Sequence, residues 1–159
     1  MAAAGAAVAI LLFGTSCSTL PLPLPVGKRP PLPVTDVEKQ LRAEIHLWQD
    51  VPHRLGGMNR QGIDCSALVM QIYRNVFKIQ LPRTTEGQVQ TGAPVSRDRL
   101  RAGDLVFFHS FFSGNHVGIY LNNGDFAHVS KSRGIIISNI AAPHWSRIYW
   151  QARRITPLM

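Results

Sequence analysis

The chain has 159 residues, of which 45% are hydrophobic and 16% charged, and its net charge is +8. This is the length of one domain, and the apolar content excludes a chain that is disordered throughout. The basic residues are scattered rather than gathered in a stripe with aromatic side chains. We therefore expect no nucleic-acid partner, and an anionic polymer such as a cell wall instead.

Residues 1–16 are predicted to be a signal peptide of the lipoprotein type. Residues 1–13 are nearly all small or apolar, and further small residues lead to Cys17. Such a segment is typical of export and is too short to span a bilayer stably. A cysteine in this position predicts that Cys17 becomes the lipidated N-terminus. A plain signal peptide is the alternative, because no Lys or Arg precedes the apolar segment.

Residues 17–33 are predicted to form a linker that begins with the lipid-bearing cysteine. Proline recurs at nearly every second position from Pro21 to Pro25 and again from Pro30 to Pro33. Proline fixes φ and removes a hydrogen-bond donor, so this segment favours an extended polyproline II conformation. We place the folded domain after this spacer, at residues 34–159.

Helices are predicted in the first half of this domain. Thr35 and Glu38 fit a capping box, and Asp64 can cap the helix that follows it. The Gly-bearing segment 53–63 is predicted to be a loop. Apolar spacing then predicts helices at 36–49 and 65–77, with a short third helix starting at 84 or 85.

Strands are predicted after Gly103, where β-branched and aromatic residues become frequent. Helices followed by antiparallel strands indicate an α+β fold. The strand segments are 104–108, 116–121, 125–129, 134–138 and 148–153.

Three residues in this pattern have the chemistry of a nucleophilic site. Cys65 begins a helix, where the dipole favours a thiolate. His116 and His128 lie on two neighbouring strands, and they share a face of the sheet only if the connecting turn has an odd number of residues or a bulge. We predict a three-residue turn at 122–124, or a bulge. A thiol, an imidazole base and a second polar group that orients the base then suffice for acyl transfer.

Several segments resemble the NlpC family of papain-like cell-wall cysteine peptidases, and its small lipoprotein murein endopeptidases in particular. They occur in the family's order over about residues 36–155. The segments are Gly57–Val69, Leu81–Thr84, Gly103–Phe108, His116–Tyr120, Phe126–Ser130 and Tyr149–Arg154.

This resemblance implies N-terminal helices packed on a five- to six-stranded antiparallel sheet. It also implies a role for each matched residue: Cys65 is the nucleophile, His116 the base and His128 the third member of the triad. Asp64 and Ser66 line the substrate cleft. His53 stands where relatives usually carry a Tyr near the oxyanion site, and its imidazole can donate a hydrogen bond there.

The resemblance further implies hydrolysis of amide bonds in peptidoglycan stem peptides or cross-links, without a cofactor or metal. The bond that is cleaved is either the D-Glu–diamino acid bond or the D-Ala–diamino acid cross-link. The domain organisation of a short lipoprotein favours the cross-link. We expect a monomer in the bacterial periplasm, anchored through Cys17 to the inner face of the outer membrane.

Three alternatives stay open. Cys65, His116, His128 and His53 could bind Zn²⁺. The chain could be a catalytically weak or inactive wall-binding lipoprotein of the same fold. His53 in place of the family's Tyr and Ala67 in place of its usual Gly favour this alternative. The chain could also transfer acyl groups on lipids. We predict structural roles for Arg83 and Asp104, and no site role for the remaining histidines, His46, His109 and His144.

Overall fold

The computed structural model describes Met1, residues 35–112 and residues 114–155. The chain divides into two units, Met1–Pro30 and Pro31–Met159, and the helices and strands described here all belong to the second. The predicted signal peptide, Cys17 and the linker up to residue 33 lie outside the described residues. Within the described ranges, no helix has the length and hydropathy needed to cross a bilayer.

The predicted helices are present, and side chains cap them at their N-termini. Thr35 accepts a hydrogen bond from the backbone N–H of Glu38, which is one half of the predicted capping box. Asp64 accepts from Ala67 N–H in the same way. These bonds satisfy backbone donors that a helix start leaves unpaired. The helices are α1 (Asp36–Leu47), α2 (Cys65–Phe77), α3 (Thr85–Val89) and α4 (Pro143–Ile148).

Six antiparallel strands form one sheet in the order β3-β8-β4-β5-β6-β7. The α+β prediction and the upper limit of the predicted strand number are therefore confirmed. The strands are β3 (Ala93–Val95), β4 (Leu105–Ser110), β5 (Gly114–Tyr120), β6 (Asp125–Ser130), β7 (Gly134–Asn139) and β8 (Tyr149–Arg154).

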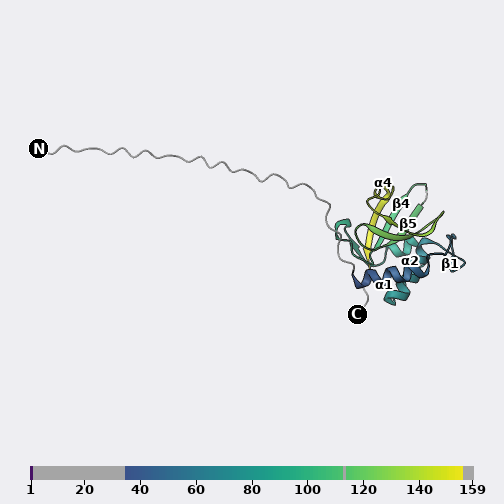
Figure 1. Cartoon of the computed structure of the whole chain (residues 1–159). Coiled ribbons are helices and arrows are strands. Elements are labelled where there is room, and N and C mark those ends of the chain that lie inside the picture. Colours follow the sequence, from purple (N-terminus) through teal and green to yellow (C-terminus); the bar gives the residue numbers. More distant parts are fainter. Residues whose placement is uncertain (2–34, 113, 156–159) are drawn as a thin grey trace. The chain divides into compact units, whose positions relative to one another are not determined.

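The two faces of the sheet carry separate apolar clusters. Phe107, Val117 and Ala127 pack with α1 and α2 on one face. Phe108 and Phe126 pack with α4 on the other. Figure 1 shows α1 and α2 on one side of the strands and α4 on the opposite side. Alternate side chains of one strand therefore enter different layers, as the pleat requires.

Four helices and strands of the structure, and a 3₁₀ helix at Arg97–Arg99, were not predicted. The segment expected to be a loop contains a short hairpin, β1 (Met58–Asn59) and β2 (Gly62–Ile63). Strand β3 is only three residues long and contains Pro94, which suits an edge strand. Helix α4 is a six-residue segment that is too short to show a helical period.

The turn between β5 and β6 has three residues, as predicted. Leu121 N–H donates to Asp125 C=O across the turn at 122–124. The β5–β6 ladder consists of Ile119↔Ala127 and Tyr120↔Phe126, a register that puts residues 116 and 128 on the same face. Beyond these two pairs the strands are not paired with each other, so the sheet opens between β5 and β6 at the end away from the turn.

Candidate functional site

A cavity of about 910 Å³ lies where β5 and β6 separate. Its lining from these strands comes only from their unpaired parts, 114–116 and 128–130. The rest of the lining comes from the start of α2, from α3 and α4, and from loop residues that include His53, Arg83 and Lys131. The volume is in the range of small-molecule and peptide sites. The local loss of strand pairing thus makes room for a substrate.

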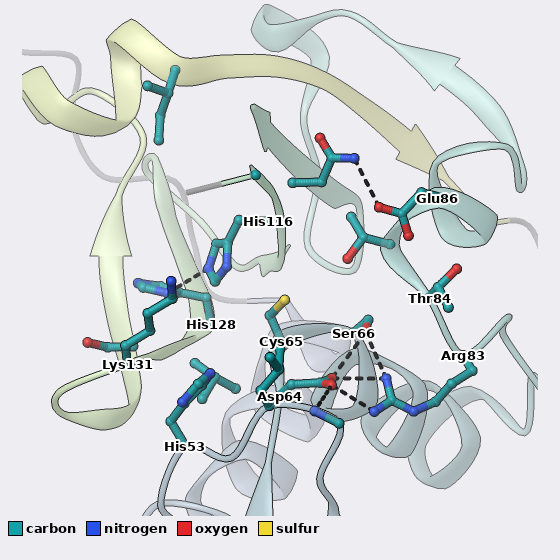
Figure 2. A pocket seen from close by; sticks show the side chains of 18 of the residues that line it. His53, Asp64, Cys65, Ser66, Arg83, Thr84, Glu86, His116, His128 and Lys131 are labelled. Carbon is teal, nitrogen blue, oxygen red and sulfur yellow. Dashed lines mark hydrogen bonds and ion pairs between the residues drawn. The ribbon is translucent and has the colours of Figure 1, made fainter. Parts of the chain in front are cut away.

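Cys65 is the first residue of α2 and points its sulfur into this cavity (Figure 2). It is a free thiol and partly buried. Burial raises the pKa of the Cys65 thiol, against the opposing effect of hydrogen bonds from Val117 N–H and the Thr85 hydroxyl. Desolvation of the charged form therefore opposes the helix terminus, which favours a thiolate.

His116 and His128 form a hydrogen-bonded pair at the same cavity. His116 Nε2 and His128 Nδ1 are 3.0 Å apart, and His128 Nε2 is 2.9 Å from Ser138 Oγ. For His116 to act as a base through Nδ1, its Nε2 must carry the proton and donate to His128. His128 then carries its own proton on Nε2 and donates to Ser138. The three residues together select one tautomer of His116.

Trp145 of α4 covers both histidines. Its ring stacks on His116 with a centroid distance of 5.6 Å and an interplanar angle of 27°, and its edge contact with His128 is at 4.7 Å. Burial lowers the pKa of His116 to about 4, with smaller contributions from the positive charges of His53, Lys131 and His144. Burial likewise lowers the pKa of His128 to about 3. Both imidazoles are therefore neutral at pH 7.

Removing the Trp145 indole tests whether burial under this ring lowers the pKa of His116. In a Trp145→Ala variant we expect the pKa of His116 to rise from about 4 toward its ordinary 6.5, because water regains access to the ring. Proton NMR of the imidazole C–H signals as a function of pH measures this directly. Trp150→Ala is the matched control, since Trp150 is 46% exposed and contacts His109 outside the cavity. An unchanged His116 pKa in Trp145→Ala would show that the indole does not cause the desolvation.

An ion pair at the start of α2 holds the segment that carries the thiol. Arg83 binds both oxygens of Asp64, at 3.0 and 2.7 Å, and also donates to Ser66 Oγ at 3.0 Å. Burial pushes the pKa of Asp64 up, but the hydrogen bonds from Arg83 and Ala67 N–H and the charge of Arg83 outweigh it, and the pKa lies below its usual value. Ser66 and Asp64 line the cavity as well. Arg83 makes the structural contacts expected of it, and it also lines the cavity.

Asp104 also has the structural role expected of it. Arg154 donates to both of its carboxylate oxygens, at 2.8 and 2.7 Å, and Arg101 N–H donates to it at 2.8 Å. These contacts tie the start of β4 to β8.

His53 reaches the cavity through a parallel bridge to the chain just before Cys65. Arg54 N–H donates to Ile63 C=O, and Ile63 N–H donates to Pro52 C=O, each at 3.0 Å. This pairing places His53 beside the residues that precede the nucleophile candidate, and its side chain lines the same cavity. Figure 2 shows His53, His116 and His128 on one side of Cys65 and Arg83 on the other.

The structure thus brings together every predicted site residue of the domain: Cys65, His116, His128, His53, Asp64 and Ser66. Cys17 lies outside the described residues. Among residues 35–112 and 114–155, no group of three or more His, Cys, Asp or Glu side chains is arranged to hold a metal ion, so the zinc alternative gains no support.

Sequence reasoning missed several residues of the site. His144, expected to have no site role, lines the cavity, whereas His46 and His109 contact Gln49 and Asn115 on the exposed surface. The other missed contributors are Thr85, Lys131, Ser138 and Trp145. The order of residues alone carries no signal for Ser138 or Trp145, because tertiary packing brings both to the histidines.

This chain is similar to proteins of one known family. The NlpC/P60 family model matches residues 50–154. The chain is 44% identical over 120 residues to the Escherichia coli K12 protein named "Murein DD-endopeptidase MepS/Murein LD-carboxypeptidase", over 76% of this chain and 64% of that protein. It is 39% identical over 128 residues to "Murein DD-endopeptidase MepH" of the same strain, over 75% of this chain and 47% of that protein.

A more distant relative is "Peptidoglycan DL-endopeptidase CwlO" of Bacillus licheniformis, at 33% identity over 62% of this chain and 23% of that protein. In each of these comparisons the aligned region is less than two thirds of the relative's length. Among solved structures, an NlpC/P60 family protein from Bacillus cereus superposes with a TM-score of 0.69 and 27% identity, covering 79% of this chain and 42% of the other. The predicted family resemblance is confirmed, and the chain belongs to the NlpC/P60 family.

Proposed function

We propose that this protein is a cysteine-type endopeptidase that hydrolyses amide bonds of peptidoglycan through Cys65, His116 and His128. The observation that carries the proposal is the shared cavity, which the Cys65 sulfur enters from α2 and the paired imidazoles enter from β5 and β6. The relatives named murein or peptidoglycan endopeptidases support the substrate class.

The first half of the proposed reaction forms a thioester. The Cys65 thiol gives its proton to Nδ1 of His116 as its sulfur attacks the scissile carbonyl carbon. Burial disfavours the charged form of both groups, which favours a proton transfer in step with the attack. The backbone N–H of Cys65 at the start of α2 and the imidazole of His53 are the proposed donors to the oxyanion. His116 then protonates the leaving amine as the C–N bond breaks.

The second half returns the enzyme to its starting state. His116 takes a proton from water, and the resulting hydroxide attacks the thioester carbonyl. The C–S bond breaks, the carboxylic acid leaves, and the sulfur of Cys65 regains its proton from His116. His128 stabilises the imidazolium in both halves, since its Nδ1 accepts from His116 Nε2.

Product analysis tests the proposal. The full chain, kept in a mild detergent, is incubated with purified sacculi, and the released muropeptides are identified by mass spectrometry beside a Cys65→Ala variant. We expect new muropeptides from the wild type alone. Their masses distinguish the D-Ala–diamino acid cross-link, which we propose, from the D-Glu–diamino acid bond. Binding of both proteins to sacculi without any release would instead favour a wall-binding protein.

We further propose that Cys17 is lipidated and that the protein acts at the inner face of the bacterial outer membrane. The apolar segment before Cys17 and the proline-rich spacer after it support this. Mass spectrometry of the mature N-terminus should find a diacylglycerol on Cys17, and an unmodified thiol there would contradict the anchor.

A further inference from the structure

The wall of the cavity next to the paired histidines contains a lysine. Lys131 follows β6 directly, and it lines the cavity together with His53 and His144. Lys131 is a cation at neutral pH, and its charge acts on His116. In Figure 2, Lys131 and His53 lie on the same side of Cys65 as the two histidines. This wall therefore presents positive charge to a bound substrate.

The carboxylates of the cavity are on its other side and already have partners. Asp64 is held in two hydrogen bonds by Arg83. Glu86 accepts a hydrogen bond from Asn115 at 3.0 Å, which lowers its pKa. In the described part of the chain, Lys131 takes part in none of the ion pairs. Its ammonium group is thus available to an anionic group of the substrate.

The position of Lys131 limits where that anionic group lies. His128 and Lys131 are three positions apart along extended or turn backbone, so their Cα atoms are at most roughly 10 Å apart at about 3.3 Å per residue. Figure 2 shows the Lys131 side chain turned toward His116 and His128, so a group that it binds lies next to the bond being cleaved. Trp145 and Ile148 also line this cavity, and apolar neighbours strengthen a charge-assisted hydrogen bond.

We propose that Lys131 binds a carboxylate on a substrate residue adjacent to the scissile amide. The inference rests on the proposed function, and it defines the substrate class more narrowly as a peptide with a free carboxylate beside the cleaved bond. The ammonium group of a lysine is a compact charge with three donors on a flexible side chain, so it can bind one carboxylate in several orientations. The same peptide with that carboxylate amidated should bind less well.

A binding experiment that needs no turnover tests this. In the full-length Cys65→Ala protein, calorimetry measures the affinity for two synthetic cross-linked peptides that differ only in a free carboxylate or a carboxamide on the diamino acid. We expect the carboxylate peptide to bind about 10-fold more tightly at low ionic strength. Introducing Lys131→Gln into the Cys65→Ala protein should remove this preference, because only the affinity for the carboxylate peptide falls. Lys131→Arg in the same background should preserve the preference.

Lys39→Gln is the matched control, because Lys39 is an exposed lysine of α1 that pairs with Asp36 outside the cavity. Equal affinity for the two peptides, or an equal loss for both in Lys131→Gln, would overturn the inference. Cleavage of the carboxylate peptide by the protein with Cys65 intact is measured separately. Selective binding without any cleavage would contradict the proposed hydrolase and leave the carboxylate site standing.

Discussion

A Cys65→Ala variant is expected to lose at least about 10⁴-fold in its rate of peptidoglycan cleavage while keeping its fold. The sulfur is the group that we propose to bond with the substrate, and no other thiol lies in the described part of the chain. The change removes one atom from a partly buried position, so the packing of α2 should be preserved. Release of muropeptides over time measures the rate, and circular dichroism with thermal unfolding checks the fold.

The matched comparison is His116→Ala, alone and combined with Cys65→Ala. Because the thiol and the imidazole act in one proton transfer, each single change should cost about as much as the double change. Independent losses that multiply in the double variant would contradict a joint role. Retention of wild-type cleavage by Cys65→Ala would disprove the cysteine mechanism outright.

The largest expected change in stability is that of Asp64→Ala, which should lower the free energy of unfolding by about 3 kcal/mol. The carboxylate caps α2 through Ala67 N–H, accepts from Gly56 N–H, and binds Arg83 through both oxygens. Alanine leaves the Arg83 guanidinium, whose side chain is only 30% exposed, without its carboxylate partner and with Ser66 Oγ and Gly57 C=O left to accept from it. Urea unfolding followed by tryptophan fluorescence measures the loss.

Asp64→Asn separates the cap from the charge. The amide oxygen can still accept from Ala67 N–H, so this variant should lose about half as much as Asp64→Ala. The pKa of Asp64 is depressed in the folded state, so its charge stabilises the fold above the ordinary pKa of 3.8, and this contribution is lost as the pH falls below that value. The difference between wild type and Asp64→Asn should therefore shrink in acid. A difference that stays constant with pH would show that the charge contributes nothing.

Local features of this protein could be predicted from its sequence because they depend on residues close together in the chain. Thr35 and Asp64 cap helices within three residues of themselves. The number of residues in the turn at 122–124 sets the register of β5 and β6, and with it the shared face of His116 and His128. The order of motifs then identified the family and the six predicted site residues of the domain.

Packing between distant segments decided the rest. Ser138 of β7 is a hydrogen-bond partner of His128. Trp145 covers both histidines from α4, a six-residue helix that is too short to show a helical pattern of apolar residues. Burial, which no short motif encodes, raises the pKa of the Cys65 thiol and opposes the effect of its place at a helix start. The sequence by itself thus determined the helix caps, the length of the turn at 122–124 and the set of predicted site residues. Desolvation, charge pairing and the shape of the cavity depend on contacts that exist only after the chain has folded.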